Sequence, residues 1–342
     1  MSLNVLVAGV PYGYQGHVDD GVWLTPQNRA TILAAAPGIT LEHPRISQLN
    51  VGVPPQRAPH AILVETSGTL LDWETLPWIL KAPGLELLVG PELRFVQSCS
   101  AGVEQLVDLV PDGVPLANAS GVHAPAIAES VFANILADAK MLEHRRSDQA
   151  ERAWRALPCW ELATSVMCVI GTGAIGIEVA KRAAAFGMRT IGISRSGRPV
   201  AVFDEVGPTA DLHRALAVAD YVVIAAPLTA ETAGLIDAAA LAAMKPGSYL
   251  VNVARGAIID EDALIASITR GHPRGAYLDC LVKEPPPQDS PLWTLPGVSI
   301  SPHDAHASQF LGDRHVEIFA ANLRRLATDA PLQNLVELSR GY

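Results

Sequence analysis

The chain has 342 residues, of which 49% are hydrophobic and 18% are charged, and its formal net charge is −10 at pH 7. This composition is typical of a globular protein and excludes a largely disordered one, and the length favours two domains over one. The negative charge, with no Lys/Arg-rich run, argues against nucleic acid or an anionic membrane surface as the main partner, because both are bound largely through basic side chains. We therefore expect a small-molecule partner, no nucleic acid and no membrane.

The N-terminal residues and the cysteines indicate the cellular compartment in which the protein is found. The opening residues MSLNVLVAGV have no basic segment before their apolar run, so we interpret them as a first strand rather than a signal peptide. No apolar run approaches the roughly 18 residues that span a bilayer. The four cysteines show neither CxxC nor zinc-site spacing, which is typical of free thiols in a reducing environment. The sequence therefore predicts a cytoplasmic protein with no metal centre.

Short apolar or β-branched runs recur along the chain, each followed by a turn and then a helix-like or alanine-rich stretch. Such alternation indicates βαβ units and parallel sheets, and therefore an α/β fold. Residues 123–149 lie between two series of these runs and carry apolar residues at helical spacing, which predicts one long helix. The predicted strands cover residues 4–10, 60–65, 95–98, 115–118, 166–170, 189–193, 221–225, 249–253, 276–278 and 298–300.

A glycine-rich turn follows the strand that begins at Val166. The strand continues directly into GTGAIG, residues 171–176, and a helix and a second strand follow. A lone GxGxxG pattern is weak evidence, but strand, glycines, helix and second strand within about 30 residues form the dinucleotide-binding fingerprint. Gly171 permits the tight turn, Gly173 lets the backbone approach a pyrophosphate, and Gly176 lets helix and strand pack closely. The alternative is a plain tight turn without a ligand.

The end of the second strand indicates which dinucleotide binds. An NAD enzyme usually has Asp or Glu there, whereas this chain has SRSGR, residues 194–198. Ser194, Arg195 and Arg198 can bind a 2′-phosphate, and no carboxylate repels it. Because charge-assisted hydrogen bonds contribute about 1.5 to 3 kcal/mol each, one well-placed arginine can decide the preference. We predict NADP(H) in preference to NAD(H), with NAD(H) still possible; the alternative is that both arginines are solvated loop residues.

Polar side chains follow several predicted strands of the second series, where ligands of doubly wound sheets bind. Arg255, Asp279 and His303 each come after such a strand, and Glu284 lies in the loop after Asp279. A guanidinium binds a carboxylate in bidentate fashion, an imidazole transfers protons near neutral pH, and a carboxylate orients the imidazole and stabilises its cation. Taken singly, each could be an ordinary surface residue. Together they predict a site that reduces a 2-keto acid, with Arg255, Glu284 and His303 as catalytic residues.

The chain resembles the D-isomer-specific 2-hydroxyacid dehydrogenases, and among them the glyoxylate/hydroxypyruvate reductases, over residues 60–342. The resemblance implies two doubly wound parallel-sheet domains: a Rossmann dinucleotide-binding domain of residues 121–304, inserted in a flavodoxin-like substrate domain of residues 1–120 and 305–342. It also implies a homodimer. The segments that carry it are FVQSCSAGVEQL, HAPAIAESV, VIGTGAIGIEVAKRAAAFGM, APLTAETAGLI, MKPGSYLVNVARGAIIDEDAL, GAYLDCLVKEPPPQDSPLW and SPH.

The resemblance also implies roles for individual residues. Arg255 would bind the substrate carboxylate, His303 would be the general acid and base, and Glu284 would be its partner. The reaction would transfer a hydride between NADP(H), or NAD(H), and a small 2-keto acid or D-2-hydroxy acid, without a metal. The other implied contacts are Ala101, Gly102 and Val103 to the substrate carboxylate, Ala174 and Ile175 to the pyrophosphate, Pro227 and Thr232 near the ribose, and Val253 and Asp279 at the nicotinamide end.

Two features depart from the family's pattern. Asp304 and His306 stand where aliphatic and small residues usually follow the histidine, and the loop from Pro11 to Trp23 is unfamiliar. Asp304 either favours the protonated form of His303 or faces solvent, and the loop either shapes specificity or is exposed. Two other functions stay open: a formate or phosphite dehydrogenase-like variant, and a catalytically weak nucleotide-sensing interaction protein of the CtBP kind. Turnover of a keto acid would indicate the dehydrogenase, whereas tight cofactor binding without turnover would indicate the interaction protein.

Overall fold

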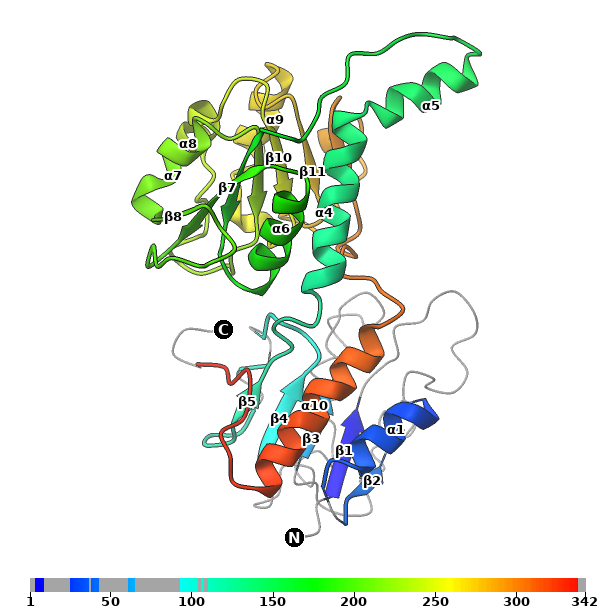
Figure 1. Ribbon diagram of the computed structural model, residues 1–342, viewed down its shortest axis with the longest axis vertical. Coiled ribbons are helices and arrows are strands. Elements are labelled where there is room, and N and C mark those ends of the chain that lie inside the picture. The colour runs from blue at the N-terminus through cyan, green and yellow to red at the C-terminus, as the bar shows by residue number, and fades with distance from the viewer. Residues whose placement is uncertain are drawn as a thin grey trace. The chain divides into compact units, whose positions relative to one another are not determined.

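The computed structural model describes residues 4–8, 25–36, 38–42, 61–64, 93–103, 106–107 and 110–337. The unfamiliar loop from Pro11 to Trp23 lies outside the described residues. The chain divides into two compact units: unit 1 comprises Met1–Val122 and Ser308–Tyr342, and unit 2 comprises His123–Ala307. Figure 1 shows each unit as a sheet with helices packed on it. Unit 1 is thus built from both ends of the chain, and unit 2 from the middle.

Unit 2 contains a parallel sheet of seven strands in the order β12-β11-β10-β9-β6-β7-β8. The chain starts in the middle of the sheet at β6, runs outward to β8, and returns to β9 on the other side of β6. This reversal creates a switch point between β6 and β9, where doubly wound sheets bind their ligands. The strands are β6 (Val166–Ile170), β7 (Arg189–Ser194), β8 (Glu205–Pro208), β9 (Tyr221–Ile224), β10 (Tyr249–Asn252), β11 (Gly275–Leu278) and β12 (Val298–Ile300).

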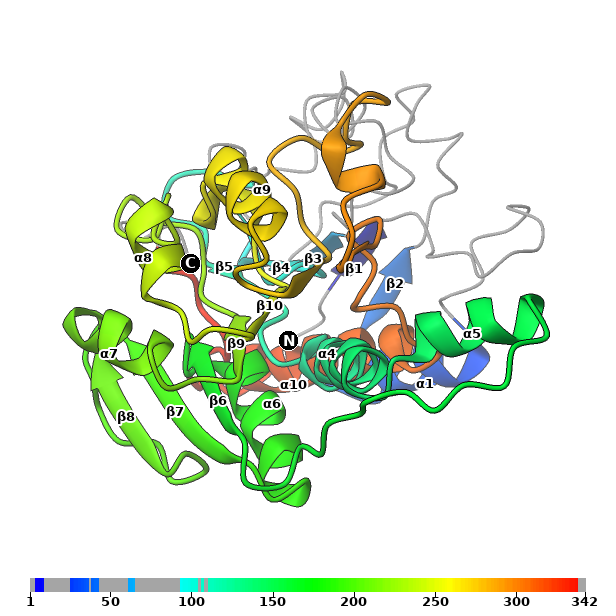
Figure 2. The ribbon, with the colours of Figure 1, turned by 90° about the horizontal axis from the view of Figure 1, so that it is seen from above.

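Helices cover both faces of this sheet, as Figure 2 shows from above. Successive residues of β6 alternate between two hydrophobic cores: Cys168 packs on the side of α7, α8 and α9, and Val169 on the side of α4 and α6. Strands buried on both faces read as continuous apolar runs, which is why the sequence revealed them. The helices are α4 (Ala124–Ala139), α5 (Leu142–Ala150), α6 (Ala174–Ala185), α7 (Leu212–Leu216), α8 (Ala238–Ala243) and α9 (Glu261–Thr269), with 3₁₀ turns at Thr209–Asp211, Gly256–Ile258 and Pro291–Trp293.

The single long helix expected over residues 123–149 is wrong, because the structure has two helices there. Helix α4 ends at Ala139, and α5 begins at Leu142. Between them Met141 adopts a left-handed conformation with φ 53° and ψ 43°. The apolar spacing stops at Leu142, and the polar segment EHRRSDQ that follows has no face to bury against the sheet. Strand β8 was also missed, because EVGP is short and contains a proline.

Unit 1 contains a parallel sheet in the order β2-β1-β3-β4-β5. The C-terminal helix α10 packs on it, and the rings of Phe95 and Phe319 lie 5.8 Å apart. The buried amide of Asn322 donates from Nδ2 to Gln97 Oε1 at 2.8 Å, which ties the end of the chain to β4. The elements are β1 (Asn4–Ala8), α1 (Pro26–Leu33), β2 (Thr40–Glu42), β3 (Ala61–Val64), β4 (Phe95–Ser98), β5 (Leu116–Ala117) and α10 (Leu311–Ala327).

Candidate active site

The glycine-rich turn lies at the switch point of unit 2 and leads into α6. Gly171 has φ +105°, its N–H donates to Ile193 O at 2.8 Å, and a Cβ there would come within 2.6 Å of the Ala225 backbone. A Cβ on Gly176 would overlap the carbonyl oxygen of Gly171. Gly173 is different, because an added Cβ would meet no atom within 4 Å. No side chain caps α6 at Gly173, so the first N–H groups of the helix, at Ala174 and Ile175, remain available for an anion.

The loop after β9 is closed by the side chain of Thr232. Its Oγ1 donates to Pro227 O at 2.7 Å and accepts from Thr229 N–H at 2.8 Å. These bonds bring the two residues assigned to the cofactor's ribose into one compact turn beside the glycine turn. Val253, assigned to the nicotinamide end, is 5% exposed and follows β10 directly. These residues therefore lie at the carboxyl edge of the sheet, where doubly wound sheets bind their ligands.

The segment after β7 presents two arginines to solvent. Ser194 Oγ accepts from Gly197 N–H at 3.2 Å, and Gly197 has φ +61°, so the segment turns tightly. Arg195 and Arg198 are both exposed. In the part of the chain that the structure describes, no carboxylate lies within ion-pair distance of either guanidinium. Both charges are therefore available to a phosphate.

The turn that carries Arg255 is held by Asn252, a residue that the sequence analysis missed. Asn252 is fully buried at the end of β10; its Nδ2 donates to Arg255 O at 3.0 Å, and its Oδ1 accepts from Ala254 N–H at 3.1 Å. A Cβ on Gly256 would overlap the backbone of Leu281. This glycine thus allows the Arg255 turn to approach the loop that carries Glu284. The signal in the sequence that could have revealed Asn252 was an amide side chain near the carboxyl end of a predicted apolar strand.

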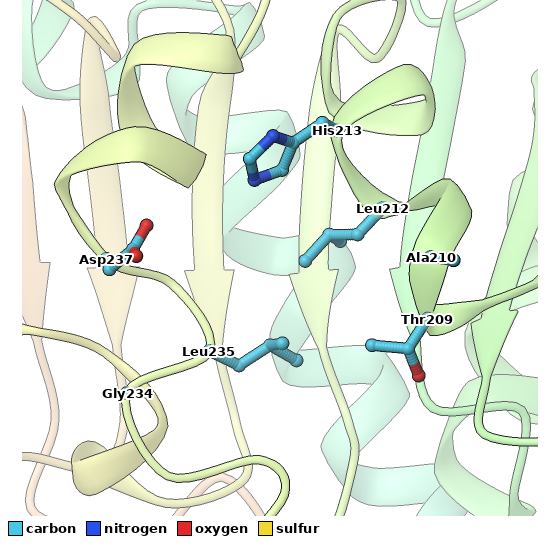
Figure 3. Close-up of a pocket in the computed structure, with 7 residues that line it drawn as sticks. All are labelled: Thr209, Ala210, Leu212, His213, Gly234, Leu235 and Asp237. Carbon is cyan, nitrogen blue, oxygen red and sulfur yellow. The ribbon is translucent and has the colours of Figure 1, made fainter.

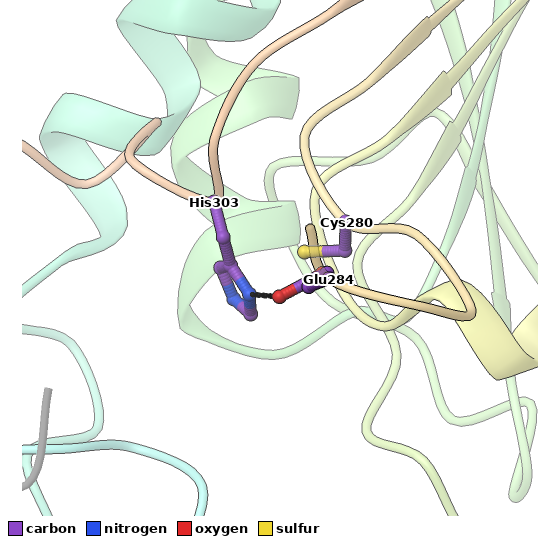
Figure 4. Close-up of side chains that lie close together, drawn as sticks. All are labelled: Cys280, Glu284 and His303. Atoms are coloured by element: carbon purple, nitrogen blue, oxygen red, sulfur yellow. Dashed lines mark hydrogen bonds and ion pairs between the residues drawn. The ribbon is translucent and has the colours of Figure 1, made fainter. Parts of the chain in front are cut away.

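His303 and Glu284 form a hydrogen-bonded pair after the last strands of unit 2 (Figure 4). His303 Nδ1 lies 2.8 Å from Glu284 Oε2, and Leu281 N–H donates to Glu284 Oε1 at 2.9 Å. Burial raises the pKa of Glu284, but the hydrogen bonds from His303 and Leu281 and the positive charges of His303 and Arg255 outweigh it, so its pKa is lowered. The ionised carboxylate holds the proton on Nδ1 and leaves Nε2 for proton transfer.

Asp279 holds the loop on which His303 stands. Asp279 is 3% exposed, and its Oδ1 accepts from Ser301 Oγ at 2.6 Å and from the backbone N–H groups of Asp304 and Ala305 at 3.1 Å each. His303 lies inside this loop with φ 57°, a conformation that non-glycine residues seldom adopt. The carboxylate therefore stabilises the conformation that projects the imidazole, a contact that residue spacing alone did not reveal.

The two residues that depart from the family's pattern are placed differently. The side chain of Asp304 is exposed, whereas the ring of His306 meets the ring of His123 edge-on, with centroids 5.3 Å apart. Burial and the charge of His303 lower the pKa of His306. His306 is therefore a neutral packing residue at the junction of α4 and the His303 loop.

The residues assigned to the substrate in unit 1 follow β4. Asn118 Nδ2 donates to Ala101 O at 3.1 Å, and Val103 is buried with 1% exposure. Ser100 N–H donates to Ser98 Oγ at 2.9 Å. These bonds fix the backbone of the Ala101-Gly102-Val103 segment within unit 1.

A separate pocket of about 390 Å³ opens on the α7 and α8 face of unit 2 (Figure 3). None of the residues assigned to substrate or cofactor lines it. The side chains that converge at the carboxyl edge of the sheet, rather than this cavity, therefore mark the candidate active site. Its lining residues are Thr209, Ala210, Leu212, His213, Gly234, Leu235 and Asp237.

The fold, the glycine turn and the polar side chains at the carboxyl edge of the sheet together define a nicotinamide-dinucleotide-dependent oxidoreductase. The model of the D-isomer specific 2-hydroxyacid dehydrogenase NAD binding domain matches residues 132–305. A putative 2-hydroxyacid dehydrogenase of Haemophilus influenzae is 33% identical over 273 residues, which are 74% of this chain and 80% of the relative. The protein belongs to the D-isomer-specific 2-hydroxyacid dehydrogenase family, which confirms the resemblance and the predicted fold of two doubly wound domains.

Two further relatives are informative about the family. The glyoxylate/hydroxypyruvate reductase A of Klebsiella pneumoniae is 28% identical over 268 residues, which are 76% of this chain and 85% of the relative. The crystal structure of a D-isomer specific 2-hydroxyacid dehydrogenase from Xanthobacter autotrophicus, in complex with NADPH and MES, superposes with a TM-score of 0.79 at 27% identity and covers 100% of both chains. Among the described residues, no helix has the length and apolar character needed to cross a membrane.

Proposed function

We propose that the protein reduces a small 2-keto acid to the D-2-hydroxy acid with NADPH, and catalyses the reverse oxidation. The observation that carries this proposal is the His303–Glu284 hydrogen bond of 2.8 Å beside the Arg255 turn, at the edge of the sheet where the glycine turn opens. Bound NADPH would supply the hydride. The open space at Gly173 and the uncapped start of α6 fit its pyrophosphate.

The protein's own groups handle the proton and the charge. Protonated His303 donates from Nε2 to the carbonyl oxygen as this oxygen becomes an alkoxide, and Glu284 stabilises the imidazolium before the transfer. Arg255 binds the substrate carboxylate through two hydrogen bonds, and its charge lowers the energy of the developing alkoxide. In the oxidative direction neutral His303 accepts the hydroxyl proton at the same atom.

We further propose that the protein prefers NADP(H), because Arg195 and Arg198 are exposed after β7 and no carboxylate follows that strand directly. The Xanthobacter relative was solved with NADPH, which supports this preference. The kcat/KM values for NADPH and NADH test it. We expect Arg195→Ala combined with Arg198→Ala to lower kcat/KM for NADPH by about tenfold or more, since charge-assisted hydrogen bonds are lost, and to leave the value for NADH unchanged. Equal kcat/KM for both cofactors in the wild type would contradict the proposal.

The substrate class is proposed by analogy with a named relative. The Klebsiella relative is a glyoxylate/hydroxypyruvate reductase, so we propose glyoxylate or hydroxypyruvate as substrates here. Oxidation of NADPH in the presence of 2-keto acids from glyoxylate to phenylpyruvate provides the test. Tight NADPH binding with no turnover of any keto acid would instead favour a nucleotide-sensing interaction protein, and oxidation of formate or phosphite would favour the variant dehydrogenases.

We also propose a homodimer of cytoplasmic location, in which residues 121–304 form the dinucleotide-binding domain. Within unit 2, α5 and the segment after it extend away from the sheet (Figure 1), and this segment carries the fully exposed Trp154 and the half-exposed Trp160. Large apolar side chains that are exposed on a protruding segment are typical of subunit interfaces.

The proposed cytoplasmic location is supported by the cysteines. All four are free thiols, and Cys159 is exposed, which agrees with a reducing compartment.

A further inference from the structure

Cys280 lies beside the His303–Glu284 pair, and none of the roles proposed above uses it. It follows β11 and is 2% exposed. Its Sγ, a carboxylate oxygen of Glu284 and a ring nitrogen of His303 all lie within 4.8 Å of one another. Figure 4 shows the three side chains converging from two loops, with Cys280 and Glu284 on the loop after β11 and His303 on the loop after β12. A thiol, a carboxylate and an imidazole thus meet at the centre of the catalytic apparatus.

These three donors match the ligand preferences of zinc. Zn²⁺ binds thiolate sulfur, imidazole nitrogen and carboxylate oxygen at about 2.0 to 2.3 Å, so donor atoms in a tetrahedral site are roughly 3.3 to 3.8 Å apart. Glu284 and His303 are both partly exposed at 40% and 37%, so rotation of these side chains can close the remaining distance. Mg²⁺ and Ca²⁺ prefer sites made of oxygen, so the thiol selects a softer ion.

Two of the donors are positioned by the backbone. Leu281 N–H donates to Glu284 Oε1 at 2.9 Å, and Cys280 Sγ donates to Ala254 O at 3.3 Å, next to Arg255. Three protein ligands leave a fourth position open for water or for an oxygen of an organic acid.

We propose that Cys280, Glu284 and His303 form an inhibitory Zn²⁺ site in this enzyme. On binding, the Cys280 thiol releases its proton to solvent, an Sγ–Zn bond forms, and the metal takes up an imidazole nitrogen and the carboxylate; no group is oxidised or reduced. Zinc then occupies the groups that hold and orient the catalytic proton, so turnover stops. The inhibitory effect rests on the proposed function, whereas metal binding itself does not.

Cobalt binding tests the site independently of activity. The full chain is stripped of metal, kept reduced and titrated with Co²⁺, whose thiolate complexes absorb in the near ultraviolet. We expect a sulfur-to-cobalt band that Zn²⁺ abolishes by displacement. Cys280→Ala should lose the band, and the matched variant Cys159→Ala, which removes an exposed thiol, should keep it. No band in the wild type, or a band that persists in Cys280→Ala, overturns the proposal.

Inhibition provides the second measurement. Zn²⁺ should inhibit keto-acid reduction by the wild type, a chelator should restore it, and Cys280→Ala should need a Zn²⁺ concentration higher by about tenfold or more, as expected when a metal contact is lost. NADPH binding, followed by fluorescence, shows that the variant is folded; Cys280→Ser replaces it if alanine prevents folding. Equal sensitivity of wild type and variant to Zn²⁺ contradicts the inhibitory role. A cobalt band without turnover of any keto acid refutes the proposed function and leaves the metal site standing.

Discussion

At the scale of single residues, the proposed chemistry depends on an imidazole whose tautomer is set by one carboxylate. Glu284 is ionised because hydrogen bonds and positive charges outweigh the effect of burial on its pKa. In the proposed reaction, its hydrogen bond to His303 Nδ1 leaves Nε2 to donate to the carbonyl oxygen. Spacing along the chain suggested this pair, and the 2.8 Å contact gives it a physical basis.

Replacing His303 tests the proton transfer directly. We expect His303→Ala to lower kcat by about 10² to 10⁴-fold, because positioned proton transfer contributes that much, with little change in the dissociation constant of NADPH. Steady-state kinetics and fluorescence titration measure the two quantities. His144→Ala, on the exposed surface of α5, is the matched control and should retain full activity. An unchanged kcat in His303→Ala would refute the assignment.

We expect Asn252 to be a positioning residue that acts through Arg255. Asn252→Ala leaves Ala254 N–H and Arg255 O without their side-chain partner, so the turn shifts. Because a displacement of about 1 Å can cost 10²-fold in rate, we expect kcat/KM for the keto acid to fall by about 10 to 10²-fold, with NADPH affinity unchanged. Asn252→Asp, which keeps the acceptor for Ala254 N–H, should recover part of the loss. Equal kcat/KM values in Asn252→Ala and wild type would show that Arg255 does not need this support.

At the scale of elements, one arginine joins helix α4 to the sheet of unit 2. Arg274 forms an ion pair with Asp138 at the end of α4, and its guanidinium lies 5.3 Å from the ring centroids of Trp160 and Tyr221 and 5.6 Å from that of Tyr249. Arg274 and Asp138 side chains are 22% and 18% exposed, so solvent screens the pair weakly. This cluster anchors α4 just before the chain leaves the sheet for α5.

Removal of the arginine should destabilise unit 2. Arg274→Ala leaves the partly buried Asp138 without its partner and loses the contacts with three rings, so we expect a loss of about 2 to 4 kcal/mol in the free energy of unfolding. Urea denaturation followed by circular dichroism measures it. Arg274→Ala combined with Asp138→Ala should be less unstable than the single variant, because no unpaired charge remains. Identical stabilities of the two variants would contradict the importance of the ion pair.

At the scale of the whole molecule, Trp154 tests the proposed homodimer. Trp154→Ala should shift the protein toward the monomer, because an exposed tryptophan on a protruding segment is suited to anchor an interface. Light scattering coupled to gel filtration measures the mass. Trp293→Ala is the control: that ring is also exposed, but its Nε1–H donates to Pro287 O within its own loop at 2.8 Å. A monomeric wild type would refute the homodimer, and an unchanged dimer in Trp154→Ala would remove this residue from the interface.

The sequence by itself determined the class of fold and much of the candidate site. Buried parallel strands are continuous apolar runs, and the glycines at 171 and 176 are required by close backbone approaches, so both leave a local signal. Arg255 and His303 were predicted for a related reason, since each follows such a strand within three residues. Strand β8 and the break at Met141 gave no comparable signal, because a four-residue strand that ends in proline and a single left-handed residue leave no periodic pattern.

Only the tertiary structure decided which distant residues meet. The amide of Asn252 supports the Arg255 turn, and the carboxylate of Asp279 holds the His303 loop. Cys280 joins Glu284 and His303 because the loops after β11 and β12 converge at one edge of the sheet. Such contacts depend on the register of parallel strands and on the course of their loops. Neither is encoded in the spacing of residues along the chain, so the zinc site could be inferred only from the folded protein.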